Sequence, residues 1–229
     1  RLKAEGGEFL SAMEFFSDIG LSIALENIPE LVFPLQSRAS FYLLIEAGSG
    51  SMQVPLDSIL TAVMEWGMDE DIVADGALAM SDSQRAAFWR LREEQPEGQR
   101  RLGAQLKHDL SVPPHRLDEF LDRANDKCDE ILKGVIINAF GHLGDGNVHF
   151  NLSPPMGRQD FSDLGDEFSI KLGRLATTMG GSFAAEHGVG RTKIPLKDLL
   201  REPVERNLMV SLKKALDEND QFNPGVLVS

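Results

Sequence analysis

The sequence predicts an α+β fold in which helices pack on an antiparallel sheet. Apolar runs of strand length alternate irregularly with longer amphipathic stretches, rather than as a regular βαβ series. Two of the strand-like runs flank Asp145-Gly146, a dipeptide typical of a tight hairpin turn and so of antiparallel pairing. At 229 residues and 42% hydrophobic content, the chain can bury a core without disulfides or a structural metal.

The first half of the chain predicts one strand and two helices. Residues 41–46 form an apolar run that ends at a Gly-Ser-Gly sequence, as a buried strand does. Residues 56–66 carry apolar side chains at helical spacing. A helix over 81–94 begins at serine and aspartate side chains able to cap it, and we expect Pro96-Glu-Gly98 to break it.

The second half predicts three strands and three helices. The strand at 107–112 is stopped by two prolines, and an amphipathic helix follows at 116–132. Strands at 135–140 and 148–152 form the hairpin. Two further helices close the chain, at 160–179 and at 197–219.

The charge balance excludes several classes of partner. Lys and Arg number 23 against 36 Asp and Glu, a formal net charge of −13, whereas nucleic acid and anionic membranes attract clustered basic residues. We therefore expect neither nucleic acid nor a membrane as a partner. The single cysteine, Cys128, cannot form an internal disulfide, which favours a reducing compartment, and we expect a cytoplasmic location.

The hairpin brings two histidines together. A two-residue turn at Asp145-Gly146 would place His142 directly opposite His149, with their Cβ atoms roughly 4.5–5.5 Å apart on one face. Two imidazoles at that separation can bind one metal ion. Asn151 lies two residues beyond His149 and projects from the same face.

A second cluster joins an acid to a histidine. Glu186-His187 lies among glycines, which let the backbone approach a ligand closely. Glu186 could complete a His₂Glu site with an open coordination position, which is typical of catalytic metal sites. His187 would then be free to transfer a proton.

These two segments resemble a known family. Residues 141–149 (GHLGDGNVH) and 186–191 (EHGVGR) are similar to the signature segments of the C-terminal domain of FAD-linked oxidases. The family includes D-2-hydroxyglutarate, D-lactate and glycolate dehydrogenases of the vanillyl-alcohol-oxidase flavoprotein superfamily. Further matches run in order along the chain, at 10–14, 89–93, 107–113 and 222–225.

The resemblance implies that residues 1–229 are a substrate- and metal-binding C-terminal domain, related to the ferredoxin-like sandwich. An N-terminal FAD domain would precede it, outside this chain. By position in the motifs, the metal ligands would be His142, His149 and Glu186, and the general base would be His187. The residues that contact the substrate would be Arg92, Lys107 and Asn151. The implied cofactors are FAD and a divalent metal, with Zn²⁺ favoured and Fe²⁺ or Mn²⁺ left open.

The implied activity is oxidation of a small D-2-hydroxy acid to a 2-oxo acid, by metal-assisted deprotonation and hydride transfer to the flavin. Pro96 stands one turn after Arg92, where relatives that recognise a second carboxylate would use a polar side chain, which argues against a 2-hydroxyglutarate-like substrate and leaves the particular acid open. The electron acceptor and the association of two copies also stay open. Two other functions are consistent with the residues: a metal-dependent hydrolase using the His₂Glu site, and a module that binds a hydroxy acid without turnover.

Overall fold

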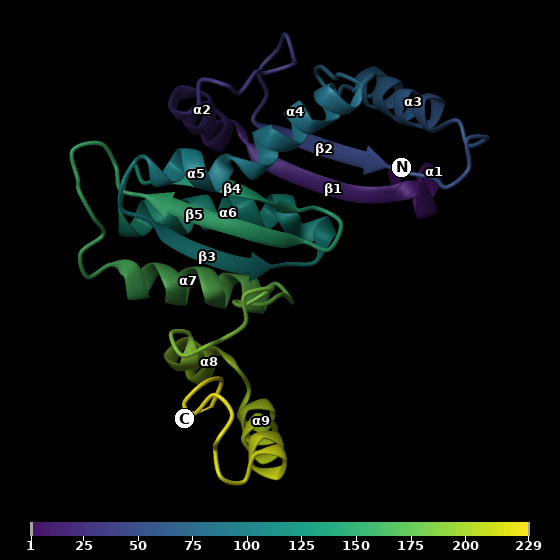
Figure 1. The fold of residues 1–229 in the computed structure, drawn as a ribbon. Helices are drawn as coiled ribbons and strands as arrows, with labels where there is room; N and C mark the ends of the chain where they lie inside the picture. Colours follow the sequence, from purple (N-terminus) through teal and green to yellow (C-terminus); the bar gives the residue numbers. More distant parts are fainter. Residues whose placement is uncertain (1, 229) are drawn as a thin grey trace.

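The computed structural model describes residues 2–228, and its centre is a five-stranded antiparallel sheet with the strand order β2-β1-β4-β5-β3 (Figure 1). The strands are β1 (Leu10–Ser17), β2 (Phe41–Ala47), β3 (Leu106–Ser111), β4 (Ile136–His142) and β5 (Asn147–Ser153). The predicted α+β class is confirmed, and so are four of the five strands. The sequence patterns missed β1, which lies between β2 and β4.

Three helices cover one face of the sheet: α2 (Asp18–Asn27), α4 (Asp82–Glu93) and α5 (Gln95–Arg100). Their apolar side chains pack on alternate residues of the neighbouring strands, among them Phe16 of β1 and Phe140 of β4. The predicted break is confirmed, since α4 ends at Glu93 and Glu94 is a turn. The chain turns there into the short helix α5, because proline is tolerated in the first turn of a helix.

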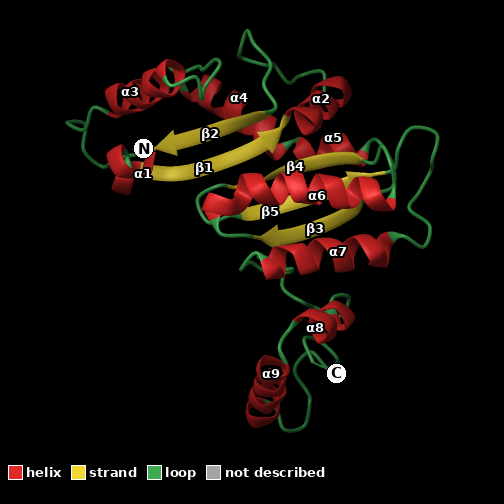
Figure 2. Ribbon diagram, turned by 180° about the vertical axis from the view of Figure 1, so that it is seen from behind, coloured by secondary structure: helices red, strands yellow, loops and turns green. Residues whose placement is uncertain are grey.

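The opposite face is covered by α6 (Leu117–Ile131), which lies in front of the sheet in Figure 2, and by α7 (Gly165–Thr178) near β3. Phe120, Phe150 and Phe168 meet there and are fully buried. The predicted apolar face of α6 is confirmed, and its buried residues are Leu117, Phe120, Leu121, Ala124 and Cys128. Helix α7 begins five residues later than predicted.

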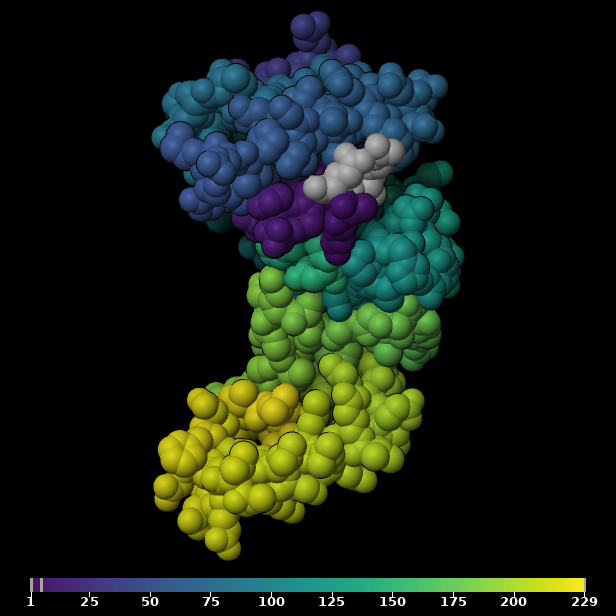
Figure 3. Space-filling model, turned by 90° about the vertical axis from the view of Figure 1, so that its right-hand side faces the viewer, coloured from purple at the N-terminus to yellow at the C-terminus, as the bar shows by residue number. Residues whose placement is uncertain are grey.

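The remaining elements lie at the periphery. They are α1 (Leu2–Glu5), α3 (Leu56–Asp69), the 3₁₀ helices η1 (Gly7–Phe9) and η2 (Pro114–Arg116), α8 (Ile194–Leu200) and α9 (Pro203–Leu216). The single helix predicted at 197–219 is wrong, because Pro203 lacks the N–H that continuation would need and opens α9 instead. The segment from α8 to the C-terminus projects from the body of the molecule (Figures 1 and 3). None of the described helices is both long and apolar enough to span a membrane.

Candidate metal and substrate site

The β4–β5 hairpin has a longer turn than predicted. Phe140, not His142, lies opposite His149, and the Gly146 N–H donates to the His142 carbonyl at 3.0 Å, so the loop contains four residues. Gly146 has a φ of +78°, which glycine adopts without strain. The predicted register is wrong by two positions, yet both imidazoles still project from one face, because side chains alternate with a period of two. Their ring centroids are 5.9 Å apart.

The second segment reaches the same face across β3. Ser182 pairs with Ser111 by two backbone hydrogen bonds, at 2.9 and 3.0 Å. Glycine is needed at the preceding position, since a Cβ on Gly181 would lie 1.7 Å from the Ser111 carbonyl oxygen. This close approach delivers Glu186 and His187 to the end of the hairpin that carries the histidines.

A buried carboxylate fixes that segment. Asp109 of β3 is 2% exposed, and its Oδ2 accepts the backbone N–H groups of Glu186 at 2.9 Å and His187 at 2.8 Å. Its Oδ1 accepts the side-chain amide of Asn147 at 3.2 Å. The Lys193 ammonium lies 4.0 Å away and supplies an opposite charge.

The four predicted metal and base residues meet here. Glu186 places one oxygen 3.4 Å from His142 Nε2 and the other 3.7 Å from His149 Nε2. The exposed His187 ring stacks on His149 with centroids 5.6 Å apart. The ligand atoms of His149, Glu186, His187 and Asp109 all lie within 4.8 Å of one another. Two donor sets therefore share His149 and Glu186: the predicted one, completed by His142, and a second one, completed by His187 and Asp109.

The electrostatics of the site suit a cation. Burial, together with the positive charge of Arg92, lowers the pKa of His149 to about 4, so this imidazole is neutral near pH 7, as a metal ligand must be. Burial would raise the pKa of Asp109, but the backbone N–H groups of His187 and Glu186 outweigh it and the pKa is lowered. A neutral imidazole thus lies beside an ionised carboxylate.

The three predicted substrate residues lie on the side of the sheet that carries the histidines. Arg92 of α4 is 8% exposed and stacks over the Phe140 ring, with its Cζ 4.7 Å from the centroid. Asn151 is buried on β5, directly opposite Lys107 of β3, whose side chain is exposed. Register places Asn151 and Lys107 on the face that bears His149 and Asp109.

Sequence reasoning missed three polar residues of the site: Glu14, Asp109 and Lys193. Glu14 and Asp109 carry a recognisable signal, because an acid inside an apolar strand needs a partner when it is buried. Glu14 lies opposite His142 in the β1–β4 pairing. Identifying its partners requires the fold.

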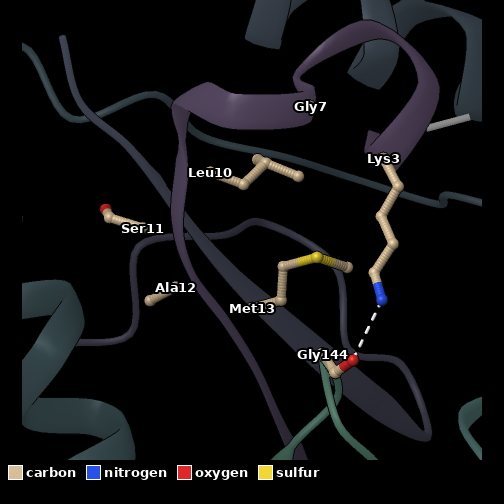
Figure 4. Close-up of a pocket in the computed structure, with 7 residues that line it drawn as sticks. All are labelled: Lys3, Gly7, Leu10, Ser11, Ala12, Met13 and Gly144. Carbon is tan, nitrogen blue, oxygen red and sulfur yellow. Dashed lines mark hydrogen bonds between the residues drawn. The ribbon is translucent and has the colours of Figure 1, made fainter.

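Open space adjoins two of the predicted metal ligands, His142 and Glu186. A cavity of about 330 Å³ is lined by β1 residues together with His142, Gly144 and Glu186. It shares Ser11, Ala12, Met13 and Gly144 with a second cavity of about 460 Å³ at the start of β1. There the Lys3 ammonium donates to the Gly144 carbonyl at 2.9 Å (Figure 4). A small molecule therefore has room beside His142 and Glu186.

Sequence comparison identifies the family. The family model described as "FAD linked oxidases, C-terminal domain" matches residues 1–227. The chain belongs to this family. The resemblance drawn from the two motifs is confirmed, and a match to FAD-linked oxidases gives no support to the hydrolase that the predicted metal ligands alone left open.

Three similar relatives carry the name D-2-hydroxyglutarate dehydrogenase. D-2-hydroxyglutarate dehydrogenase, mitochondrial, of Arabidopsis thaliana is 32% identical over 218 residues, covering 95% of this chain and 38% of the relative. The mitochondrial enzyme of that name from Rattus norvegicus is 31% identical, over 97% of this chain and 40% of the relative. D-2-hydroxyglutarate dehydrogenase of Xanthomonas citri pv. viticola is 31% identical, over 95% of this chain and 46% of the relative. This FAD-linked oxidase domain thus spans about two fifths of the length of these relatives.

Proposed function

We propose that residues 1–229 form the substrate- and metal-binding domain of an FAD-dependent dehydrogenase that oxidises a D-2-hydroxy acid to a 2-oxo acid. The observation that carries the proposal is the convergence of His142, His149 and Glu186, with His187 stacked beside them. The names of the relatives support the substrate class, since each acts on D-2-hydroxyglutarate. The flavin domain lies outside this chain in the proposal.

The donor set fits a divalent metal. Two imidazoles and a carboxylate are the ligands of many catalytic zinc sites, and the adjoining cavity leaves a position open for substrate. We propose that His142, His149 and Glu186 hold the ion, and favour zinc by ligand type. When bound, such an ion supplies Lewis acidity that makes a coordinated hydroxyl group easier to deprotonate.

His187 is proposed as the general base. Its Nδ1 lies 3.9 Å from Asp109 Oδ2, on the side of the ring turned toward β3, which leaves Nε2 to accept the proton of the substrate hydroxyl. The buried Asp109 carboxylate stabilises the imidazolium that results. FAD, when bound, supplies the acceptor for the hydride that leaves C2.

Positive charge around the site selects an acid. Glu14 accepts from Arg92 Nε and lies 3.0 Å from its Nη2, which leaves Nη1 as the Arg92 donor toward a substrate carboxylate, and Lys107 contributes an exposed point charge. The buried amide of Asn151 lies between Lys107 of β3 and Asn138 of β4 in the register. We propose that these three groups orient the carboxylate end of the substrate toward the metal ligands.

Rapid-mixing flavin reduction tests the function. Native full-length protein is mixed without oxygen with D-lactate, D-2-hydroxyglutarate and their L-enantiomers, and flavin absorbance is followed. We expect reduction by a D-acid and a loss of about 10²–10⁴-fold in its rate in His187→Ala, with metal content unchanged. The exposed His115, in η2, provides the matched control His115→Ala. Unchanged reduction in His187→Ala contradicts the assigned role, and reduction by none of the acids contradicts the proposed function.

The compartment is also a proposal. Cys128 is buried and unpaired, which supports a reducing compartment, and we propose the cytoplasm. The plant and rat relatives are named as mitochondrial proteins. Cell fractionation with an antibody against the native protein distinguishes the two locations.

A further inference from the structure

We infer that Glu14 is a positioning residue, which orients His142 for metal binding and fixes Arg92 beside it. The inference rests on the proposed function, because Glu14 acts through two residues of that site. Glu14 lies on β1, directly opposite His142 of β4, and is 6% exposed. Its two carboxylate oxygens have different partners.

One oxygen sets the orientation of His142. Glu14 Oε1 lies 2.8 Å from His142 Nδ1, and because a carboxylate only accepts, Nδ1 is the donor. The lone pair of the neutral ring is then on Nε2, the atom that lies 3.4 Å from Glu186. A carboxylate bonded to the far nitrogen of a metal-binding histidine fixes its tautomer and ring orientation.

The other oxygen holds Arg92. Glu14 Oε2 accepts from Arg92 Nε at 3.0 Å and forms an ion pair with Arg92 Nη2, also at 3.0 Å. A carboxylate and a guanidinium this deeply buried each require the other, since an unpaired charge there is costly. Glu14 therefore couples the residue proposed to bind the substrate carboxylate to a residue proposed to bind the metal.

Glu46 also joins a strand of the sheet to an arginine of α4, but it has no histidine partner. Glu46 of β2 accepts from Arg85 Nε and Trp89 Nε1 of α4, both at 2.7 Å, and from the Ser11 hydroxyl at 3.1 Å. It links the sheet to the same helix that carries Arg92. Glu46→Gln is therefore the matched control, because it removes a strand-to-helix ion pair and leaves His142 its partner.

Glutamine at position 14 cannot serve both partners while His142 keeps its proton on Nδ1. If its amide oxygen accepts from His142, its NH₂ group faces the Arg92 donors; if it turns round, the NH₂ group faces the His142 N–H. The volume of the side chain is nearly unchanged. Glu14→Gln thus removes the positioning function with little change in packing.

Zinc affinity measured by competition with a chromogenic chelator tests the inference on native full-length protein. In Glu14→Gln we expect affinity to fall about 10–100-fold, and in Glu46→Gln to change by no more than about twofold. If the glutamine variant does not fold, Glu14→Asp replaces it, since this shorter acid keeps the charge that Arg92 needs but cannot span both partners. Equal zinc affinity in the position-14 variant and the control overturns the inference.

A second measurement distinguishes failure of the Glu14 role from failure of the proposed function. It records imidazole ¹H–¹⁵N spectra of the zinc-free protein at about pH 8, where an ordinary imidazole is neutral. We expect His142 as a single Nδ1–H tautomer in wild type and Glu46→Gln, and as a mixture in the position-14 variant. If wild type binds no zinc, yet only the position-14 variant loses the single tautomer, the metal site fails and Glu14 still orients His142. If wild type binds zinc and oxidises a hydroxy acid while the variant keeps both tautomer and affinity, the role of Glu14 is wrong and the function stands.

Discussion

Replacing Asp109 by alanine tests how the Glu186–His187 segment is held. The substitution leaves the backbone N–H groups of Glu186 and His187 without an acceptor, as well as the side-chain amide of Asn147. An unsatisfied donor costs about 1–3 kcal/mol when buried, so we expect the free energy of unfolding to fall by about 2–4 kcal/mol, allowing for partial hydration of the two backbone groups. Lys193 also loses its nearby opposite charge.

Urea denaturation followed by circular dichroism measures this loss. Asp75 provides the control, because it also accepts backbone N–H groups, from Gln36 at 2.7 Å, Ser37 at 3.0 Å and Gly76 at 2.7 Å, but in a half-exposed loop where water replaces the lost acceptor. We expect a clearly smaller loss in Asp75→Ala and a lower zinc affinity only in Asp109→Ala. Equal destabilisation by the two substitutions would refute the reasoning that burial of the Asp109 hydrogen bonds gives them their weight.

Three further predictions concern stability. Burial lowers the pKa of His108 to about 4, so between about pH 6.5 and 4 the unfolded state binds one more proton than the folded state. As the pH is lowered through that window, this proton reduces the free energy of unfolding by up to about 3 kcal/mol. Urea titrations of zinc-free His108→Gln should lack this part of the loss that wild type shows between about pH 6.5 and 4. Phe150→Ala, at a fully buried core position, should cost about 3–5 kcal/mol in the same assay, and a cost below 1 kcal/mol contradicts the packing described. Gly146→Ala should lower the thermal midpoint, since its Cβ would lie 1.9 Å from the Val112 carbonyl oxygen at a φ of +78°; an unchanged midpoint is inconsistent with this hairpin turn.

The hairpin shows why part of the site could be predicted from the sequence. Two apolar strands around Asp145-Gly146 indicate antiparallel pairing, and strand alternation places His142 and His149 on one face whether the loop has two residues or four. The loop length itself depends on contacts outside the hairpin. The Gly146 carbonyl accepts from the Val112 N–H at 3.0 Å, a bond that no pattern within 136–153 encodes.

The partners of the acids in the site could not be predicted from local sequence patterns. Glu14 is separated by 78 residues from Arg92 and by 128 from His142, so only the completed sheet reveals its partners. Glu186 and His187 meet the hairpin because residues 181 and 182 lie against β3. Their residue types and glycine neighbours indicated a possible metal ligand and a possible proton acceptor, and the family resemblance assigned these roles by position; no pattern in the sequence showed that they meet the hairpin.

Bound zinc measured by elemental mass spectrometry tests the central claim, that the hairpin and Glu186 form a metal site. The native protein, purified without chelator or affinity tag, is compared with His149→Ala, which removes a ligand common to both donor sets, and with His142→Ala and His187→Ala, which separate them. The proposed set predicts about one ion per chain in wild type and His187→Ala, and loss of the ion in His149→Ala and His142→Ala. Retention of the ion in His149→Ala, or no ion in wild type even after zinc is added, would contradict the account.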